Sequence, residues 1–168
     1  MSAPPPGKLE ALKVKILTAG DSIENVKVEL ASESDLFFHY IHICDENSFK
    51  AVQEQQKLMV EFPDYANVLI RMLNSCIKEP QSYIAVLVMN ADGRARLDFI
   101  QNMEYKFVEL LSANFIRSPE DVIQKTITYR YNALKSRLKF MQTRLQEVNQ
   151  IVKVKNPSLL LQVGQHYG

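Results

Sequence analysis

The side chains with the most chemical potential in this sequence are two histidines and two cysteines. His39 and His42 are three positions apart in a predicted β-strand, so they face opposite sides and cannot share a metal ion. Cys44 and Cys76 match no metal-ligand spacing. Both cysteines lie in apolar stretches, which indicates buried free thiols in a reducing compartment. We therefore expect a cytosolic protein without a metal site.

Adjacent carboxylates occur at Asp45-Glu46 and at Glu120-Asp121, each at an expected helix start. Capping and the helix dipole explain both pairs without any acid–base chemistry. None of the five glycines belongs to a phosphate-binding array, and no serine lies in a nucleophile elbow. We expect no catalytic residue and no cofactor, and the protein should not be an enzyme.

Length and composition suit one domain with an appendage. The 168 residues are 46% hydrophobic, and no run of about 18 apolar residues predicts a membrane span. Residues 1–7 lack the apolar region of a signal peptide. The predicted organisation is a flexible lead over 1–8, a globular head over 9–117, a helical stalk over 118–155 and a short tail over 156–168.

The elements expected in the head begin with strands over 9–17 and 25–32 and a covered central strand from Leu36 to Cys44. A helix should start after Asp45 and bury Phe49 and Val52. A second helix should start at Phe62-Pro63-Asp64 and present one apolar face made of Tyr65, Val68, Leu69, Met72, Leu73 and Cys76.

The second half of the head is predicted to be a meander of strands. Tyr83 to Met89 is uniformly apolar, which predicts another buried strand. Asn90-Ala91-Asp92-Gly93 is a hairpin turn signal. A half-exposed strand should follow over 95–99, and the strand periodicity resumes at Phe107. Between them lies a polar tip in which Met103 and Tyr105 are the exceptions, so we expect Tyr105 to be an exposed anchor for a head-to-head contact. The alternative is a Tyr105 side chain that folds back on its own head.

A long helix should begin at Ser118, with Pro119 in its first turn, and end at Asn156-Pro157. Apolar residues recur along it at alternating spacings of four and three, which is a heptad seam. The seam consists of Ile127, Tyr131, Leu134, Leu138, Met141, Leu145, Val148 and Val152. Its first part has the alternative of packing on the head, whereas we expect the later part to pair with a second chain.

The stalk is basic. Residues 125–155 contain eight basic residues and one acidic residue, a charge of +7, and the remainder carries −6. A basic segment of this kind attracts nucleic acid, anionic lipid or the acidic surface of a polymer such as tubulin. The basic stalk face comprises Arg130, Lys135, Arg137, Lys139 and Arg144. Arg130 would oppose Lys135 of a parallel partner, so we expect only a weak parallel homodimer.

Several segments of the head share a pattern with one known family. They are Ser34-Asp35-Leu36-Phe37-Phe38, Phe49-x-x-Val52-x-x-x-Gln56, Leu58-Met59-Val60-Glu61-Phe62 and the helix from Leu69 to Cys76. On these residues, and on the order of the expected elements, the chain resembles the spindle assembly abnormal six family, the centriolar cartwheel proteins. The resemblance covers roughly residues 10–152. The segment from Leu97 to Phe115, with the short stalk, is similar to its "six-like" branch.

The resemblance implies an α+β fold: a small β-barrel or sandwich head with a helical clamp, like that of DNA end-joining scaffolds, followed by a long C-terminal helix that forms a short coiled coil. It also implies that heads join through an aromatic residue, typically phenylalanine, at a hairpin tip that enters a hydrophobic pocket of the next head. The matching tip here is 102–106, and Tyr105 stands where phenylalanine is expected.

The first functional hypothesis is therefore a structural protein that forms a homodimer and higher oligomers. It would serve the cytoskeleton at a centriole, basal body, flagellar base or apical microtubule structure, with microtubules or cytoskeletal assembly proteins as partners. The alternative is a nucleic-acid-associated scaffold of the end-joining type. The sequence lacks the long basic tail that this second hypothesis requires. We expect neither nucleic acid nor membrane as a partner.

Overall fold

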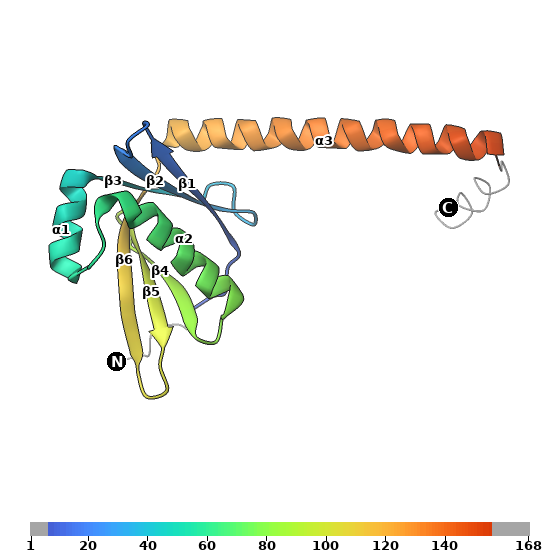
Figure 1. Cartoon of the computed structure of the whole chain (residues 1–168). Helices are drawn as coiled ribbons and strands as arrows, with labels where there is room; N and C mark the ends of the chain where they lie inside the picture. Colours follow the sequence, from blue (N-terminus) through green and yellow to red (C-terminus); the bar gives the residue numbers. More distant parts are fainter. Residues whose placement is uncertain (1–6, 156–168) are drawn as a thin grey trace. The chain divides into compact units, whose positions relative to one another are not determined.

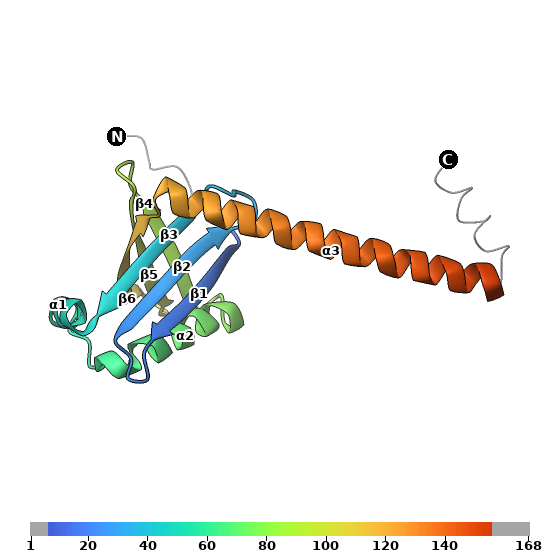
Figure 2. The ribbon, with the colours of Figure 1, turned by 90° about the horizontal axis from the view of Figure 1, so that it is seen from above.

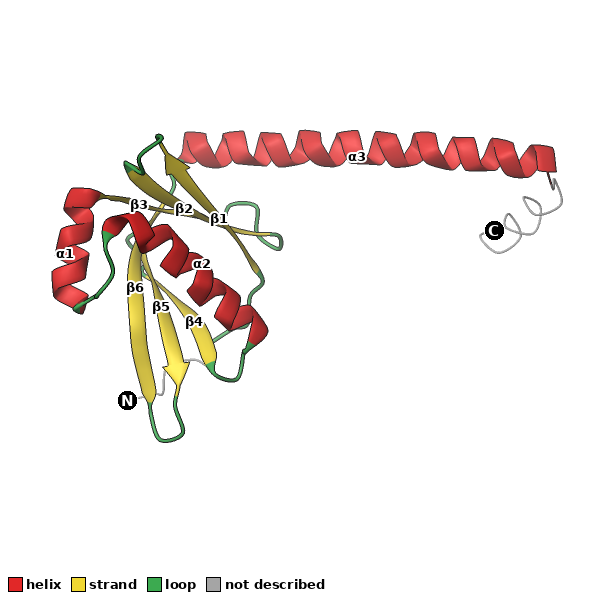
Figure 3. Ribbon diagram, in the orientation of Figure 1, coloured by secondary structure: helices red, strands yellow, loops and turns green. Residues whose placement is uncertain are grey.

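The computed structural model describes residues 7–155, so the predicted tail and most of the predicted lead lie outside the described residues. The strands are β1 (Leu12–Ala19), β2 (Asn25–Ser32), β3 (His39–Asp45), β4 (Tyr83–Met89), β5 (Arg94–Asn102) and β6 (Phe107–Arg117). The helices are α1 (Glu46–Gln56), α2 (Phe62–Lys78) and α3 (Glu120–Lys155). Figure 1 shows their arrangement along the chain, and Figure 3 separates helices from strands by colour. The predicted α+β class with a long C-terminal helix is confirmed.

The six strands form one antiparallel sheet in the order β1-β2-β3-β6-β5-β4. The strand pairing between its two halves consists of Tyr40 with Arg117 and Ile41 with Ile116. Beyond these two pairs β3 and β6 separate, and the sheet splays into two three-stranded halves (Figures 1 and 2). Because the halves diverge, each leaves an apolar inner face that another element must cover.

Helix α2 covers these inner faces. Its residues Phe62, Tyr65 and Leu69 belong to one buried cluster with side chains from both halves of the sheet. The strand members of this cluster are Val26, Val28, Leu30, Tyr40, Cys44, Ala95, Leu97, Phe99, Leu111, Ala113 and Phe115. The alternation of buried and exposed residues along β2 and β5 follows from the two-residue period of a strand.

Local sequence signals place two of the boundaries. Asp45 caps α1 through a hydrogen bond from the Ser48 amide, and the Ser48 hydroxyl accepts from the Asp45 amide, which completes a capping box. The predicted helix start after Asp45 is thus confirmed, and Phe49 is buried. The predicted turn before β5 is confirmed by Gly93, whose φ of +86° favours a residue without a Cβ.

Two sequence-based expectations are wrong. The strand expected to start at Leu36 starts at His39, because Leu36, Phe37 and Phe38 lie in the turn that precedes it. The strand Tyr83–Met89, expected to be buried, is the edge strand β4, and most of its side chains are exposed. An apolar run indicates a strand but not its position in the sheet, and here β4 pairs with β5 alone.

The described chain divides by its internal contacts into two units. The first ends at Ile123 and contains the head with the first turn of α3, in which Ile123 is buried. The second starts at Gln124 and contains the rest of α3. Among residues 7–155, none of the helices combines the length and the apolar character that a bilayer span requires.

Candidate self-association sites

The hairpin between β5 and β6 presents one aromatic side chain to solvent. Its tip is closed by hydrogen bonds from the Met103 amide to the Lys106 carbonyl (2.9 Å) and from the Lys106 amide to the Met103 carbonyl (3.3 Å). Tyr105 lies at this tip with 89% of its surface exposed, and Met103 is also exposed. In this chain Tyr105 is therefore not folded back onto its own head.

The arms of this hairpin are anchored in the core. Leu97 and Phe99 on β5 and Leu111 on β6 are buried, and β5 and β6 pair along their full length. The pairing shifts register between Phe99 and Ile100, where Leu110 forms a bulge in β6. A bulge increases the local twist of a strand pair. The tip is thus carried on a firmly held, twisted ribbon.

An apolar groove lies between β1 and α2. Its volume is about 340 Å³, and six of its seven lining residues are apolar: Leu12, Val14 and Ile16 from β1, and Ile70, Leu73 and Ile77 from α2. The seventh is Asn74. Alternate residues of β1 face the groove while Lys13 and Lys15 face away from it, as the strand period requires. The groove can accept one apolar or aromatic side chain and offers it one amide partner.

Helix α3 carries the predicted heptad seam without a break. Ile127 and Val152 are half-buried, whereas the six seam residues between them are 53–63% exposed. These six are Tyr131, Leu134, Leu138, Met141, Leu145 and Val148. A helix whose apolar stripe is open to water gains stability by burying that stripe against another helix. The seam is therefore a candidate dimer interface.

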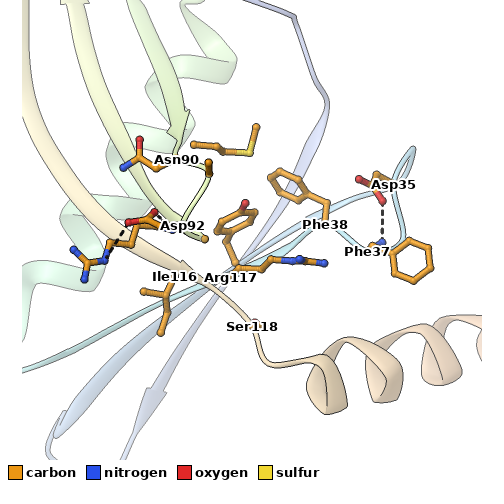
Figure 4. Close-up of a pocket in the computed structure, with 13 residues that line it drawn as sticks. Asp35, Phe37, Phe38, Asn90, Asp92, Ile116, Arg117 and Ser118 are labelled. Carbon is orange, nitrogen blue, oxygen red and sulfur yellow. Dashed lines mark hydrogen bonds and ion pairs between the residues drawn. The ribbon is translucent and has the colours of Figure 1, made fainter.

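A larger pocket of about 730 Å³ lies in the head, between the turn before β3, the turn from β4 to β5 and the end of β6. Figure 4 shows the Arg117 side chain extending toward Phe37 and Phe38 on one side, with Asp92 on another. Phe37 and Ile116 are more than half exposed. The lining mixes aromatic, acidic and basic groups and includes neither histidine nor cysteine. The hydroxyl of the lining residue Ser118 is buried and lies 2.6 Å from His39 Nδ1.

These features coincide with a known family. The family model described as "Centriolar protein SAS N-terminal domain" matches residues 5–115. The chain belongs to this SAS-6 N-terminal domain family. The match includes the hairpin tip, the groove and the whole sheet except the last two residues of β6, and it ends before α3 begins.

Curated relatives carry the same family name at low identity. The chain is 22% identical over 135 residues to the "Spindle assembly abnormal protein 6 homolog" of Danio rerio, which covers 76% of this chain and 22% of that protein. It is 26% identical over 106 residues to the homolog of Xenopus laevis, which covers 58% and 16%. The chain thus spans less than a quarter of the length of these relatives.

Solved SAS-6 fragments share the fold. A mutant N-terminal fragment of Leishmania SAS-6 with parts of its coiled-coil domain superposes with a TM-score of 0.71 at 19% identity, covering 89% of this chain and 85% of that chain. A Drosophila melanogaster fragment, described as dimerised via its coiled-coil domain, gives a TM-score of 0.64 at 16% identity and covers 96% and 93%. At these identities the likeness establishes the fold of the SAS-6 head with its following helix.

The basic stalk face of this SAS-6 family chain lies mostly in solvent. Lys135, Arg137, Lys139 and Arg144 are exposed, and Arg130 is half-buried. The Arg144 guanidinium carbon lies 5.6 Å from the centre of the Phe140 ring, a cation–π distance. In heptad positions Arg130, Arg137 and Arg144 flank the seam on one side. The structure therefore presents basic groups beside the seam.

His39 and His42 each form hydrogen bonds with other segments of the head and do not contact each other. His39 Nδ1 lies 2.6 Å from the Ser118 hydroxyl just before α3. His42 Nδ1 lies 2.6 Å from the Asn114 carbonyl, which can only accept, so Nδ1 carries the proton and Nε2 accepts from the Tyr65 hydroxyl at 3.0 Å. Burial lowers the pKa of His42 below its ordinary value, partly opposed by the hydrogen bond to Asn114.

The two cysteines are not poised for reaction. Burial raises the pKa of Cys44 and of Cys76 above the ordinary thiol value, so both stay protonated near neutral pH. Within residues 7–155, no cluster of three or more histidine, cysteine or acidic side chains could hold a metal ion.

Some exposed apolar residues were not predicted from the sequence. Tyr129, Phe140 and Ile151 lie on α3 outside the predicted seam, and each is more than half exposed. A heptad count alone assigns them to outer or flanking positions, and Phe140 also lies against the Arg144 guanidinium. The β1–α2 groove was also missed, because its two walls are more than 50 residues apart in the chain.

Proposed function

We propose that this chain is a non-enzymatic structural protein of the centriole or of a related structure, namely a basal body, flagellar base or apical microtubule structure. It builds its assembly through two self-contacts, one between α3 helices and one between heads. The observation that carries the proposal is the seam of α3, whose six residues from Tyr131 to Val148 are each more than half exposed. The family membership of residues 5–115 supports the centriolar setting.

The first contact is a parallel pairing of α3 through its seam. Leu138, Met141 and Leu145 supply apolar area, which stabilises the pair by about 25 cal/mol per Å² buried. Arg130 of one chain faces Lys135 of the other, and this like-charged pair opposes association. Fewer than four complete heptads with such flanks should give a dimer that dissociates at concentrations in roughly the high micromolar range.

The second contact inserts Tyr105 of one head into the β1–α2 groove of another. The groove is apolar and open, and the exposed tip carries an aromatic ring. Asn74 in the groove supplies the amide that a phenol hydroxyl needs when it leaves water. This pairing accounts for tyrosine at a position where the family typically has phenylalanine.

The head-to-head contact should be weak by itself. Burying one aromatic ring yields about 2–3 kcal/mol of gross gain, and the loss of translational and rotational freedom consumes most of it. Two different contacts on one chain nevertheless produce extended or closed assemblies, because each dimer joined through α3 presents two heads at once. Multivalency then compensates for the weakness of each contact.

Sedimentation of the full chain tests this proposal. Wild type should show higher oligomers at high concentration, Tyr105→Glu should remove the association that depends on the head-to-head contact, and Leu138→Glu should remove the association that depends on α3. The double variant should show neither contact. Imaging of a tagged copy against centriole and flagellar-base markers tests the location. A wild type that stays monomeric near 1 mM, or a tagged copy absent from these structures, would refute the proposal.

A second candidate function rests on the charge of α3. The basic stalk face suits an acidic partner surface, and within the centriolar setting this is most simply the microtubule. Nucleic acid is the alternative polyanion, as in an end-joining scaffold. A salt titration of binding to duplex DNA and to microtubules distinguishes them, because real phosphate contacts give a steep dependence of affinity on salt.

A further inference from the structure

The two edges of the sheet differ in how they are protected. On the edge strand β1, Lys13 and Lys15 alternate with the apolar residues that line the groove, and Lys13 also pairs with Glu33 at 2.5 Å. Charged side chains of this kind, lysine above all, discourage the pairing of an edge with another strand. The opposite edge strand, β4, has the sequence Tyr-Ile-Ala-Val-Leu-Val-Met and contains no charge, proline or glycine.

Edge strand β4 is also exposed on its outer face. Ile84, Val86 and Val88 alternate along this face and are 37–42% exposed, and Met89 at the end of the strand is more than half exposed. On the neighbouring β5, Val86 lies opposite Asp98 and Val88 lies opposite Arg96. The apolar stripe on β4 therefore lies between polar residues of β5 and the open edge of the sheet.

The direction of the backbone hydrogen bonds shows which groups face this edge. The Asn90 amide donates to the Arg94 carbonyl at 2.8 Å, and the Asn102 amide donates to the Ser82 carbonyl at 2.7 Å. In a regular antiparallel pair the bonded positions alternate. Even-numbered residues of β4 therefore bond to β5, and the odd-numbered Ala85, Leu87 and Met89 direct their amides and carbonyls outward. In residues 7–155, β5 is the only strand that pairs with β4.

We propose that β4 pairs with β4 of a second copy, antiparallel about a two-fold axis at Val86. In this register Ala85 exchanges hydrogen bonds with Leu87 of the other copy, so the outward backbone groups of both strands are used. Ile84 lies opposite Val88 of the other copy, and Val86 lies opposite itself. The two sheets become one continuous sheet with a shared apolar stripe.

A second copy suits this edge because the strand is self-complementary. Every cross-strand pair in the two-fold register is apolar, and a two-fold axis places no like charges opposite each other. The pairing of β4 with β5 shows no register shift, so the edge is regular along its length, unlike the bulged β5–β6 pair. An exposed edge of this type is otherwise an aggregation site.

This contact is separate from the hairpin tip and from α3. A strand pair of this length buries far less than the roughly 1,200–2,000 Å² of a stable interface. It should therefore be weak alone and gain strength when other contacts bring copies together. If β4 pairing fails, the two contacts of the proposed function stand unaffected.

The test uses the full chain carrying both Tyr105→Glu and Leu138→Glu, so that the hairpin and α3 contacts are absent. Sedimentation equilibrium up to about 1 mM should still show a dimer. Adding Ala85→Pro should weaken this dimer at least about tenfold. Proline is tolerated at an edge position whose amide faces outward, so the head should keep its circular dichroism spectrum.

The register is tested at the two-fold position. Val86→Lys should abolish the dimer, since two lysines would face each other, and Val86→Glu should do the same. An equimolar mixture of these two variants should dimerise again. Val86→Thr, which keeps the β-branch, is the matched control and should retain the dimer.

Amide hydrogen exchange gives an independent readout. Exchange of Ala85, Leu87 and Met89 should slow at least about tenfold between dilute and concentrated samples, whereas the even-numbered residues of β4 should change little. The proposal is overturned if the Tyr105→Glu, Leu138→Glu background stays monomeric at 1 mM, in which case another chain or another segment covers this edge. It is also overturned if Ala85→Pro and Val86→Lys leave the dimer unchanged, or if the mixed charges do not restore it.

Discussion

Gln56 and Ser112 are joined by two hydrogen bonds that replace a missing strand pair. The Gln56 side-chain amide donates to the Ser112 carbonyl at 2.8 Å, and the Ser112 amide donates to Gln56 Oε1 at 2.8 Å. Strand β6 pairs with β3 only at its end, so the Ser112 backbone has no strand partner on that side. The last turn of α1 thus closes the gap between the two halves of the sheet.

Gln56→Leu should lower the free energy of unfolding by about 1–3 kcal/mol, because it leaves both backbone groups of Ser112 without a partner. Chemical denaturation followed by circular dichroism measures this loss. Gln55→Leu, at the exposed neighbouring position, is the control and should change stability by less than about 0.5 kcal/mol. Equal losses in the two variants would show that the paired hydrogen bonds do not stabilise the head.

The head should lose stability as the pH falls below about 6.5. Burial lowers the pKa of both His39 and His42 in the folded state, so the unfolded chain binds protons more readily in this range. Each titrating histidine contributes up to about 1.4 kcal/mol per pH unit to the change in the free energy of unfolding. Stability should be level above pH 7 as far as these groups are concerned. Denaturation curves collected between pH 5 and pH 8 measure the effect.

His42→Gln should make this decline shallower, because one of the two titrating groups is removed while an amide donor for the Asn114 carbonyl remains. Tyr65→Phe separates hydrogen bonding from titration. It removes the donor to His42 Nε2 and should cost about 1–3 kcal/mol at pH 7.5. An identical pH profile for wild type and His42→Gln would contradict the assignment of the decline to His42.

Leu138→Glu should abolish the α3 dimer, because it places a charge in the middle of the seam. Tyr129→Glu changes an exposed residue off the seam and is the matched control, which should dimerise like wild type. Lys135→Glu should instead tighten the dimer several-fold, since Arg130 of the partner would face an acid. Sedimentation equilibrium measures all three, and a tightening by Leu138→Glu or a loss with Tyr129→Glu would exclude a parallel seam in this register.

Tyr105 and Asn74 should be energetically coupled across the head-to-head contact. Tyr105→Phe should weaken the contact because the Asn74 amide is left without the hydroxyl, and Asn74→Leu should weaken it because the hydroxyl loses its partner. The double variant should bind better than the sum of the two losses predicts, with a coupling of about 0.5–3 kcal/mol. Oligomer distributions in the Leu138→Glu background give these values. Strictly additive losses would show that Tyr105 does not contact Asn74 in the β1–α2 groove.

Reversal of two charges in the basic stalk face should reduce microtubule binding. Arg137→Glu with Lys139→Glu should lower pelleting with microtubules at low salt and flatten its dependence on salt. Lys50→Glu with Lys78→Glu makes the same change in net charge on exposed positions of the head and is the control. Pelleting that is unchanged by the stalk reversal would show that the basic stalk face does not bind microtubules.

Much of the architecture was predictable from local pattern. The heptad spacing from Ile127 to Val152, the capping signal at Asp45 and the turn ending at Gly93 each depend on residues close together in the chain. The backbone period of a helix or a tight turn is set within a few residues, so the sequence alone determines it. The exposed position of Tyr105 follows from the same reasoning, because polar residues interrupt the strand pattern on both sides of it.

The tertiary structure decided which faces are open. Tyr83–Met89 has the composition of a buried strand, yet it is an edge, because the order of strands depends on pairings between distant segments. The groove between β1 and α2 and the bonds from Gln56 to Ser112 likewise join residues more than 50 positions apart. Local periodicity says which side of a strand is apolar, but only the assembled sheet determines whether a neighbour covers that side. The surfaces left open for a second copy are therefore a property of the fold.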